Sequence, residues 1–161
     1  MANFTGANVI TASDVTAYQT DAFDFGIASG ASSVTAWLAQ TTNDILRDLR
    51  IKWFPVYKTN VFTDITVLGS VEMDNTKVNL DQFERAGVYL FLSRFYLPAL
   101  TKFRPEADKD RFERMIEFYS SAYVKEFQTI LEDGVNYDSD AGGSISTSER
   151  EPLHSYRRLT R

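Results

Sequence analysis

The sequence contains no cysteine, which excludes disulfides, thiolate metal sites and a cysteine nucleophile. No apolar run approaches the roughly 20 residues that a membrane-spanning helix needs. The residues after Met1 show neither the basic n-region nor the apolar h-region of a secretion signal. We therefore expect a protein that is made in the cytoplasm and has no membrane partner.

Lysine and arginine are absent from residues 1–46, where Asp14, Asp21, Asp24 and Asp44 carry the charge. Residues 154–161 have the opposite character, with three arginines and no acid, although the net charge is −5. An acidic chain is poorly suited to gripping nucleic acid phosphates as its main task. Unless the asymmetry is accidental, it indicates that the two ends meet different partners, or neighbours in an oligomer.

Apolar and aromatic residues are abundant. Hydrophobic residues make up 43% of the 161 positions, and there are 12 Phe, 8 Tyr and 2 Trp. A chain of this length and composition forms one domain by default and can bury a core. Because aromatic residues are enriched at interfaces as well as in cores, some of them are expected to contact partners.

Three stretches have helical periodicity. Residues 33–54 carry a stripe from Val34 to Leu49, with Ser33 as the expected N-cap and Pro55 as the terminator, and Thr11 or Ser13 caps a shorter helix before them. Residues 79–97 begin with a predicted capping box, Asn79 with Gln82, and Pro98 predicts a kink or an end near Phe95. Residues 105–133 form the clearest helix, begun by Pro105 and ended by Gly134.

Residues 56–78 form an insertion of different character. β-Branched residues and turn signals (Gly69-Ser70, Asp74-Asn75) predict two or three short strands, or an extended loop with hairpin character. From residue 135 the composition shifts again, because Gly142, Gly143 and Pro152 interrupt a polar stretch without helical period. The predicted fold is mainly α: a small helical bundle over 1–134 with the insertion at 56–78, and an extended C-terminal arm over 135–161.

Candidate chemistry is sparse. His154 is the single histidine and has no evident shielded partner, so it indicates an incidental residue rather than a general base. The carboxylate pairs Asp108/Asp110 and Glu113/Glu117 lie among basic residues, as on a solvated helix face. One further group supplies oxygen ligands without the spacing of an EF-hand, and we interpret it as a solvated turn rather than a calcium site: Asp133, Asn136, Asp138 and Asp140. We expect no catalytic residue, no metal and no cofactor.

Three stretches carry a resemblance to a known family: "ITASDVTAY", "VNLDQFERAGVYLFLSRFY" and the closing "HSYRRLTR". With the order of helices, insertion, aromatic helix, long helix and arm, they resemble the head–tail adaptor (connector) proteins of tailed bacteriophages. These are helical-bundle proteins that form a ring under the portal. The resemblance spans nearly the whole chain.

The resemblance implies a structural virion protein without catalysis. Its partners would be the portal protein, tail or neck proteins, and further copies of itself in a ring, usually of 12 copies, with DNA passing through the lumen without sequence-specific binding. It places the protein at the neck of the virion. It implies that the arm contacts the portal through Leu153, Tyr156, Arg157, Arg158, Leu159 and Arg161. It implies that the insertion contacts a neighbouring subunit or the tail through Val61, Phe62, Ile65 and Val67.

Two other hypotheses stay open from the residues alone. One is a monomeric helical binding or regulatory module, in which the aromatic helix over residues 80–95 would line a groove for a peptide or small ligand. The other is a small hydrolase that uses carboxylates such as Glu113 and Glu117. Stacking by Tyr156 and the positive charge of the arginines would also allow this segment to bind nucleic acid. An acidic groove on a protein partner fits three arginines better.

Overall fold

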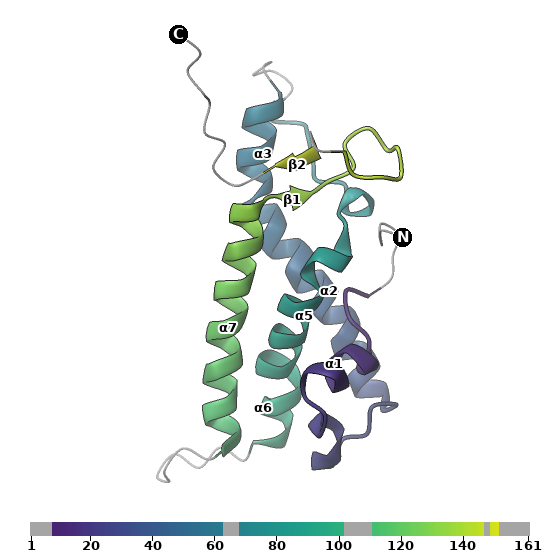
Figure 1. Ribbon diagram of the computed structural model, residues 1–161, viewed down its shortest axis with the longest axis vertical. Coiled ribbons are helices and arrows are strands. Elements are labelled where there is room, and N and C mark those ends of the chain that lie inside the picture. The colour runs from purple at the N-terminus through teal and green to yellow at the C-terminus, as the bar shows by residue number, and fades with distance from the viewer. Residues whose placement is uncertain (1–7, 63–67, 102–110, 147–148, 152–161) are drawn as a thin grey trace. The chain divides into compact units, whose positions relative to one another are not determined.

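The protein is mainly helical. The computed structural model describes residues 8–62, 68–101, 111–146 and 149–151. Its helices are α1 (Ala12–Tyr18), α2 (Ser32–Lys52), α3 (Phe54–Val61), α5 (Glu84–Phe91), α6 (Leu97–Leu100) and α7 (Arg111–Asp133) (Figure 1). Two short strands, β1 (Val135–Asn136) and β2 (Arg150–Glu151), pair in antiparallel fashion. The expected class, a mainly α protein of the small helical-bundle type, is confirmed.

The described residues divide into two compact units. Unit 1 comprises Leu46–Gln82 together with the described residues from 128 to 151, and unit 2 comprises Asn8–Ile45 and Phe83–Phe127. The helices α2 and α7 each contribute residues to both units.

Helix α1 of unit 2 begins with a capping box. Thr11 Oγ1 accepts a hydrogen bond from the Asp14 N–H at 3.4 Å, and Asp14 Oδ2 accepts one from the Thr11 N–H at 2.7 Å. The pair satisfies two backbone donors that a first helical turn leaves without partners. Of the two caps considered, Thr11 is therefore the one used.

Helix α2 contains the predicted apolar stripe. It begins at Ser32, so Ser33 lies inside the first turn and is not the N-cap that the sequence predicted. A serine on either side of a helix start satisfies the same local preference, and sequence alone does not choose between adjacent serines. The stripe itself is buried as expected at Val34, Leu38, Thr41, Ile45, Leu46 and Leu49.

The aromatic helix expected over residues 79–97 is divided. A 3-10 turn (Leu80–Phe83) precedes α5, and a π-helical segment (Leu92–Tyr96) separates α5 from α6. Pro98, in the first turn of α6, has no N–H to donate to the preceding turn, and a π-helical turn accommodates such a break. The predicted irregularity near Phe95 is confirmed.

In unit 1, Phe54–Val61 form the helix α3, whereas residues 56–61 were expected to belong to short strands or an extended loop. Pro55 lies in the first turn of α3, where a backbone N–H would have no partner within the helix. The proline that was expected to end the preceding helix therefore lies at the start of the next one. Phe54 and Tyr57 are buried on one side of α3, and this packing outweighs the β-propensity of the neighbouring residues. In the described part of the insertion, residues 56–62 and 68–78, the extended pairing is an isolated bridge at Val78.

The end of α7 is tied to the start of the aromatic helix. Gly134 adopts a left-handed conformation (φ 107°) and donates its N–H to the Ile130 carbonyl at 3.0 Å, as predicted for a terminator. The predicted capping box is only half formed, because Asn79 accepts from the Asp81 N–H at 3.2 Å but Gln82 turns elsewhere. Gln82 donates to the Gly134 carbonyl at 2.7 Å and accepts from the Asn136 N–H at 3.0 Å.

The described residues 135–146 and 149–151 are part of unit 1, where the sequence predicted the start of an extended arm. β1 pairs with β2, Val135 opposite Glu151. The Tyr137 ring lies 5.5 Å from that of Trp53 and 5.1 Å from that of Tyr57, and Val135 and Tyr137 are buried. The glycines of this stretch predict a mobile segment. Ring contacts with Trp53 and Tyr57, which are far away in the sequence, instead fix the position of Tyr137.

Candidate functional site

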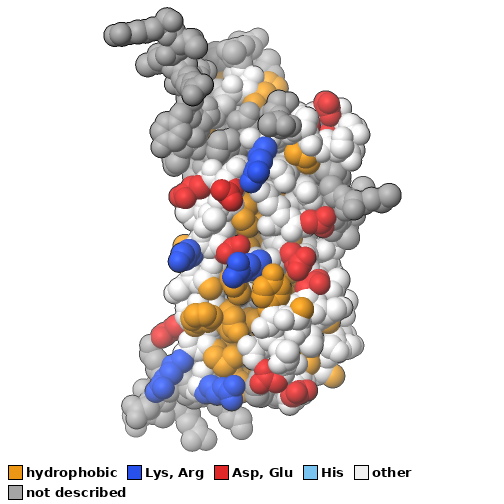
Figure 2. Space-filling model, in the orientation of Figure 1, with side chains coloured by type: hydrophobic (Ala, Val, Ile, Leu, Met, Phe, Trp, Pro, Cys, Tyr) orange, Lys and Arg blue, Asp and Glu red, His pale blue; other side chains and the backbone are white. Residues whose placement is uncertain are grey.

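Unit 2 carries an exposed aromatic patch, which we call the tyrosine surface. It consists of Tyr18 on α1, Tyr89 on α5, and Phe118 with Tyr119 on α7. The ring centres of Tyr18 and Tyr89 are 6.3 Å apart, those of Tyr89 and Tyr119 5.9 Å, and those of Phe118 and Tyr119 5.2 Å. Phe118 is 65% exposed and Tyr18 45%. Figure 2 shows a band of hydrophobic side chains over α5 and the adjoining part of α7, bordered by acidic and basic groups.

Polar contacts hold the rings in place. Arg85 lies over the Tyr89 ring, with its guanidinium carbon 5.8 Å from the ring centre, and its Nε donates to the Tyr89 hydroxyl at 3.0 Å. Its Nη1 is 3.9 Å from Glu126 Oε2. The Tyr119 hydroxyl donates to Gln19 Oε1 at 2.8 Å. Fixed rings lose less conformational freedom on binding, which is why such anchors are effective at interfaces.

The pKa values of Tyr18 and Tyr119 are raised, so these two hydroxyls keep their protons. Burial, followed by the negative charge of Glu84, raises the pKa of Tyr18, and burial, followed by Tyr89 and then Asp21, raises the pKa of Tyr119. A phenol that holds its proton offers a donor and a ring face, and it does not serve as a base at neutral pH. The surface is therefore suited to recognition of another molecule rather than to proton transfer.

Unit 1 carries a second candidate, a groove of about 410 Å³ that we call the aromatic groove. Behind it, the Trp53 ring stacks on Tyr57 with 4.7 Å between centres. The groove is lined mainly by aromatic and aliphatic side chains: Phe54, Tyr57, Val61, Phe62, Val71 and Tyr137. Concave apolar surfaces of this size are typical of sites for a ligand or for a partner's side chains.

Charged groups lie along the groove. Glu72, Asp74 and Lys77 contribute to its lining. The hydroxyl and N–H of Thr76 donate to Asp74 Oδ1 at 2.7 and 2.9 Å, and these bonds lower the pKa of that carboxyl. A neighbouring hollow of about 340 Å³ shares Phe54, Val71 and Glu72 with the groove and adds Arg50 and Lys58. Both signs of charge are thus available to orient a bound chain.

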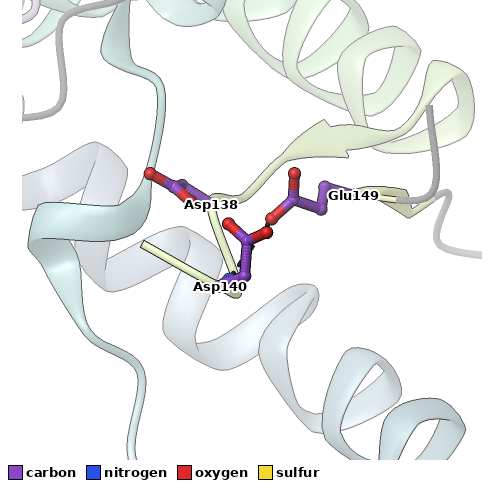
Figure 3. Close-up of side chains that lie close together, drawn as sticks. All are labelled: Asp138, Asp140 and Glu149. Atoms are coloured by element: carbon purple, nitrogen blue, oxygen red, sulfur yellow. Dashed lines mark hydrogen bonds between the residues drawn. The ribbon is translucent and has the colours of Figure 1, made fainter. Parts of the chain in front are cut away.

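Three carboxylates converge in the loop between β1 and β2. The oxygens of Asp138, Asp140 and Glu149 lie within 4.8 Å of one another, and Figure 3 shows the Asp140 and Glu149 carboxylates turned toward each other. The sequence grouped Asp138 and Asp140 with Asp133 and Asn136, whereas in the structure the third acid is Glu149. This residue lies beyond the Gly142-Gly143 turn, so local spacing does not reveal it.

Hydrogen bonds within the loop occupy these carboxylates. The two oxygens of Asp138 accept from the N–H groups of Gly142 and Gly143, at 2.9 and 2.8 Å. Glu149 Oε1 accepts from Ser139 N–H at 2.8 Å, and Oε2 accepts from the N–H and hydroxyl of Ser146 at 2.9 and 2.8 Å. These bonds, those of Ser146 foremost, lower the pKa of Glu149 to about 2. The three carboxylates could hold a cation, but in the structure their oxygens accept the hydrogen bonds that close the loop.

The predicted contact residues fall into two groups. Val61, which is 44% exposed, and Phe62 line the aromatic groove. Ile65 and Val67 lie outside the described residues. So do all six predicted arm residues (Leu153, Tyr156, Arg157, Arg158, Leu159 and Arg161), together with His154, Asp108 and Asp110.

The other predicted candidates are not brought together into a site. Glu117 is exposed and Glu113 half-buried on α7, a helix surface that also carries Arg111 and Arg114. In the helix expected to line a ligand groove, Leu80, Phe83, Val88, Leu90 and Phe91 are all buried. These residues form core, and the aromatic groove lies at α3.

Sequence reasoning missed the tyrosine surface. Its members come from three helices that are far apart along the chain, and each looks locally like one more aromatic of an apolar stripe. A usable signal was the position of Tyr18 at the last residue of a short helix, beyond the buried Val15. Only the packing of α1 against α5 brings that ring to Tyr89.

In comparisons with protein-family models, with curated proteins and with solved structures, nothing matches this chain. No helix in the described part of the chain combines the length and apolar character that crossing a bilayer requires.

Proposed function

We propose that this chain is a structural assembly protein of a tailed-bacteriophage virion, a head–tail adaptor that joins the portal to the tail. Copies of the chain form a ring around the DNA channel, and the chain carries out no catalysis. One observation carries the proposal: large apolar side chains are displayed to solvent next to fixed aromatic rings, most clearly Phe118 beside Tyr119. Such displays are characteristic of surfaces that other chains cover.

The aromatic groove supports the same proposal from unit 1. Val61 and Phe62, which the resemblance assigned to a contact with a neighbouring subunit or the tail, line it. A groove bounded by aromatic rings and charges of both signs accommodates an apolar anchor of a neighbouring chain and fixes its orientation. The tail component or a neighbouring copy supplies that anchor.

The C-terminal residues 152–161 complete the proposal from the sequence. β2 ends at Glu151, and the residues that follow combine Arg157, Arg158 and Arg161 with Leu153, Tyr156 and Leu159. Arginine and tyrosine are favoured interface anchors. Because every copy in a ring presents the same segment, weak individual contacts with the portal add up through avidity.

Cosedimentation with purified portal rings of the phage that encodes the chain tests the proposal. The full chain is expected to pellet with the portal, and a variant lacking residues 153–161 is expected to stay in the supernatant with an unchanged circular dichroism spectrum. A charge-only variant, Arg157→Ala with Arg158→Ala and Arg161→Ala, separates electrostatic from apolar contributions. Failure of the full chain to pellet with the portal would contradict the proposal.

A second candidate function has its own observation. The aromatic groove of about 410 Å³ is large enough to take a peptide side chain or a small ligand, as in a monomeric binding or regulatory module. Stabilisation of a monomer by an added ligand, measured as a rise in Tm that Phe62→Ala abolishes, would favour this function over assembly.

A further inference from the structure

The aromatic groove adjoins the charged hollow of about 340 Å³, which we call the basic hollow. Phe54, Val71 and Glu72 line both, whereas Arg50 from α2 and Lys58 from α3 line the hollow alone. All of these residues belong to unit 1. A ligand that places an apolar group in the groove therefore has a charged site within reach.

The two cations of the basic hollow have uncharged partners. Arg50 Nη2 donates to Asn75 Oδ1 at 3.2 Å, and Lys58 Nζ donates to the Leu68 carbonyl at 3.1 Å. Within the described ranges neither cation forms an ion pair, and the acid in the lining of the hollow is the exposed Glu72. The hollow therefore has an excess of positive charge, and its N–H donors fit a carboxylate.

The other charges at this end of α2 do not cancel the excess. Arg47 Nη2 lies 3.8 Å from Asp48 Oδ1, and Lys52 Nζ lies 3.6 Å from Asp48 Oδ2. Two cations thus share one acid. This part of α2 adds positive charge beside the hollow.

Negative charge gathers in the part of the groove away from the hollow. Asp74 and Lys77 line the groove and not the hollow, and the Lys77 ammonium donates to the Ser139 carbonyl at 2.9 Å. Ser139 belongs to the loop that holds three further acids: Asp138, Asp140 and Glu149. A bound carboxylate is therefore drawn to the basic hollow and repelled from the opposite part of the groove, which fixes the direction of the ligand.

One wall of the groove and the hollow offers backbone hydrogen-bonding groups. Val71 and Glu72 line both, and Met73, which is 6% exposed, lines the hollow. In the part of the chain that the structure describes, the backbone N–H and carbonyl groups of these three residues form no hydrogen bond. The next N–H along the chain, that of Asp74, donates to the hydroxyl of Tyr137 in the groove. Backbone groups without a partner in the fold are available to water or to an added chain segment.

We propose that the aromatic groove and the basic hollow together bind an extended segment of a partner protein, in which an aspartate or glutamate lies close to a large apolar residue. The carboxylate binds between Arg50 and Lys58. The apolar side chain packs on Tyr57 and Phe62, and the backbone of the segment runs along residues 71–73. This inference rests on the proposed function, in which the tail component supplies an anchor to the groove, and it names the chemistry of that anchor.

A protein segment is the occupant because it meets all three features of the site at once. Its carboxylate answers the two cations, its apolar side chain fills the aromatic groove, and its backbone pairs with residues 71–73. A small carboxylate would use the charge and the apolar surface but would leave these backbone groups without a partner.

Peptide selection followed by a double-mutant cycle tests the inference. A library of random heptapeptides displayed on yeast is selected on the immobilised full chain, and the most abundant peptide is synthesised with a fluorescent label. We expect it to contain an acidic and a large apolar residue. Replacing its acid with the corresponding amide should raise the Kd, measured by fluorescence anisotropy, by about tenfold. On an Arg50→Gln chain the same replacement should change the Kd by less than about twofold, because the cation that it faces is gone.

Two further variants complete the design. Arg114→Gln is the matched control, since Arg114 is an exposed arginine on α7 in unit 2, and it should keep the full effect of the peptide's acid. Phe62→Ala should weaken binding of the peptide by about tenfold, because it removes part of the apolar lining. Circular dichroism checks that each variant is folded, and Lys58→Gln repeats the cycle if Arg50→Gln is not.

The inference is overturned if no peptide is enriched, if the acid of the selected peptide is replaced without loss, or if its replacement has the same effect on the Arg50→Gln chain. Displacement of the peptide by naphthoate at equal concentration would assign the groove to a small carboxylate and overturn it too. So would a self-associated chain that the peptide dissociates, since the occupant would then be a second copy. Portal cosedimentation is scored separately: portal binding without peptide binding removes the inference alone, and peptide binding without portal binding removes the adaptor function and leaves the site.

Discussion

Gly87 on α5 lies so close to Ile10 that a Cβ added to the glycine would be 2.9 Å from Ile10 Cγ2. The same atom would be 3.0 Å from Val9 Cγ1. The residues before α1 therefore pack directly onto the backbone of α5, and this contact helps to hold α1, with Tyr18, beside Tyr89. A single methyl group at residue 87 would disturb both the core and the tyrosine surface.

We predict that Gly87→Ala destabilises the protein by about 1–3 kcal/mol, because Val9 and Ile10 must shift to admit the methyl group. Urea unfolding measures the change in free energy. Gly30→Ala is the matched control, since a Cβ at that position meets nothing within 4 Å. If Gly87→Ala is as stable as Gly30→Ala, the close packing of residues 9–10 on α5 is wrong.

A buried carboxylate in unit 2 gives the second prediction. Asp44 on α2 has a side chain only 5% exposed, and Arg94 Nη1 lies 3.1 Å from its Oδ2. Arg94→Ala withdraws that cation and is expected to cost about 1–3 kcal/mol in the free energy of unfolding. Arg114→Ala, an exposed arginine on α7, is expected to change stability little. Equal effects of the two substitutions would contradict a specific role for the pair.

Tyr137 tests whether residues 135–137 belong to the folded unit. Its ring packs on Trp53 and Tyr57, and its hydroxyl accepts from the Asp74 N–H at 3.2 Å. Tyr137→Ala is expected to cost about 3–5 kcal/mol, and Tyr137→Phe only about 1 kcal/mol. Thermal unfolding is followed by tryptophan fluorescence, to which Trp53 and Trp37 both contribute. An unchanged Tm in Tyr137→Ala would mean that this segment is an arm after all.

The loop closed by Glu149 should be sensitive to acid. Its pKa in the folded protein is about 2, lowered from an ordinary value of 4.5, so the unfolded chain takes up the proton first. The stabilisation is therefore complete above about pH 4.5 and is lost as the pH falls toward 2. Glu149→Gln should lack this part of the pH dependence in unfolding experiments between pH 7 and pH 2.

Glu132→Gln serves as the control for that profile, because it removes the same charge from an exposed position on α7. The wild type and Glu132→Gln should lose stability in parallel through the acid range. If Glu149→Gln follows the same curve as the wild type, the hydrogen bonds from Ser139 and Ser146 do not stabilise the loop.

The longer helices and several of their ends could be predicted from the sequence, because these features depend on neighbouring residues. The stripe from Val34 to Leu49, the Thr11 cap and the Gly134 terminator all follow from local spacing and backbone preference. The break before Pro98 follows from the missing N–H of proline. These features need no knowledge of what packs against them.

The parts that sequence reasoning missed depend on distant partners. Residues 54–61 have β-branched neighbours that favour strands, yet burial of Phe54 and Tyr57 makes them helical. Tyr137 lies near the start of a stretch of turn-forming composition, yet its ring packs on Trp53. The tyrosine surface needs three helices to pack before it exists. The candidate site could therefore be predicted only where Val61 and Phe62 enter the groove.

The central claim is that this chain joins two larger structures through surfaces that other chains cover. If the chain is the adaptor that we propose, the most direct measurement is complementation of a phage from which its gene has been deleted, followed by electron microscopy and a count of infective particles. The full chain should restore joined virions, whereas a chain lacking residues 153–161 should accumulate DNA-filled heads beside free tails. Normal virion yield from the shortened chain, or from the deletion without any chain supplied, would contradict the account.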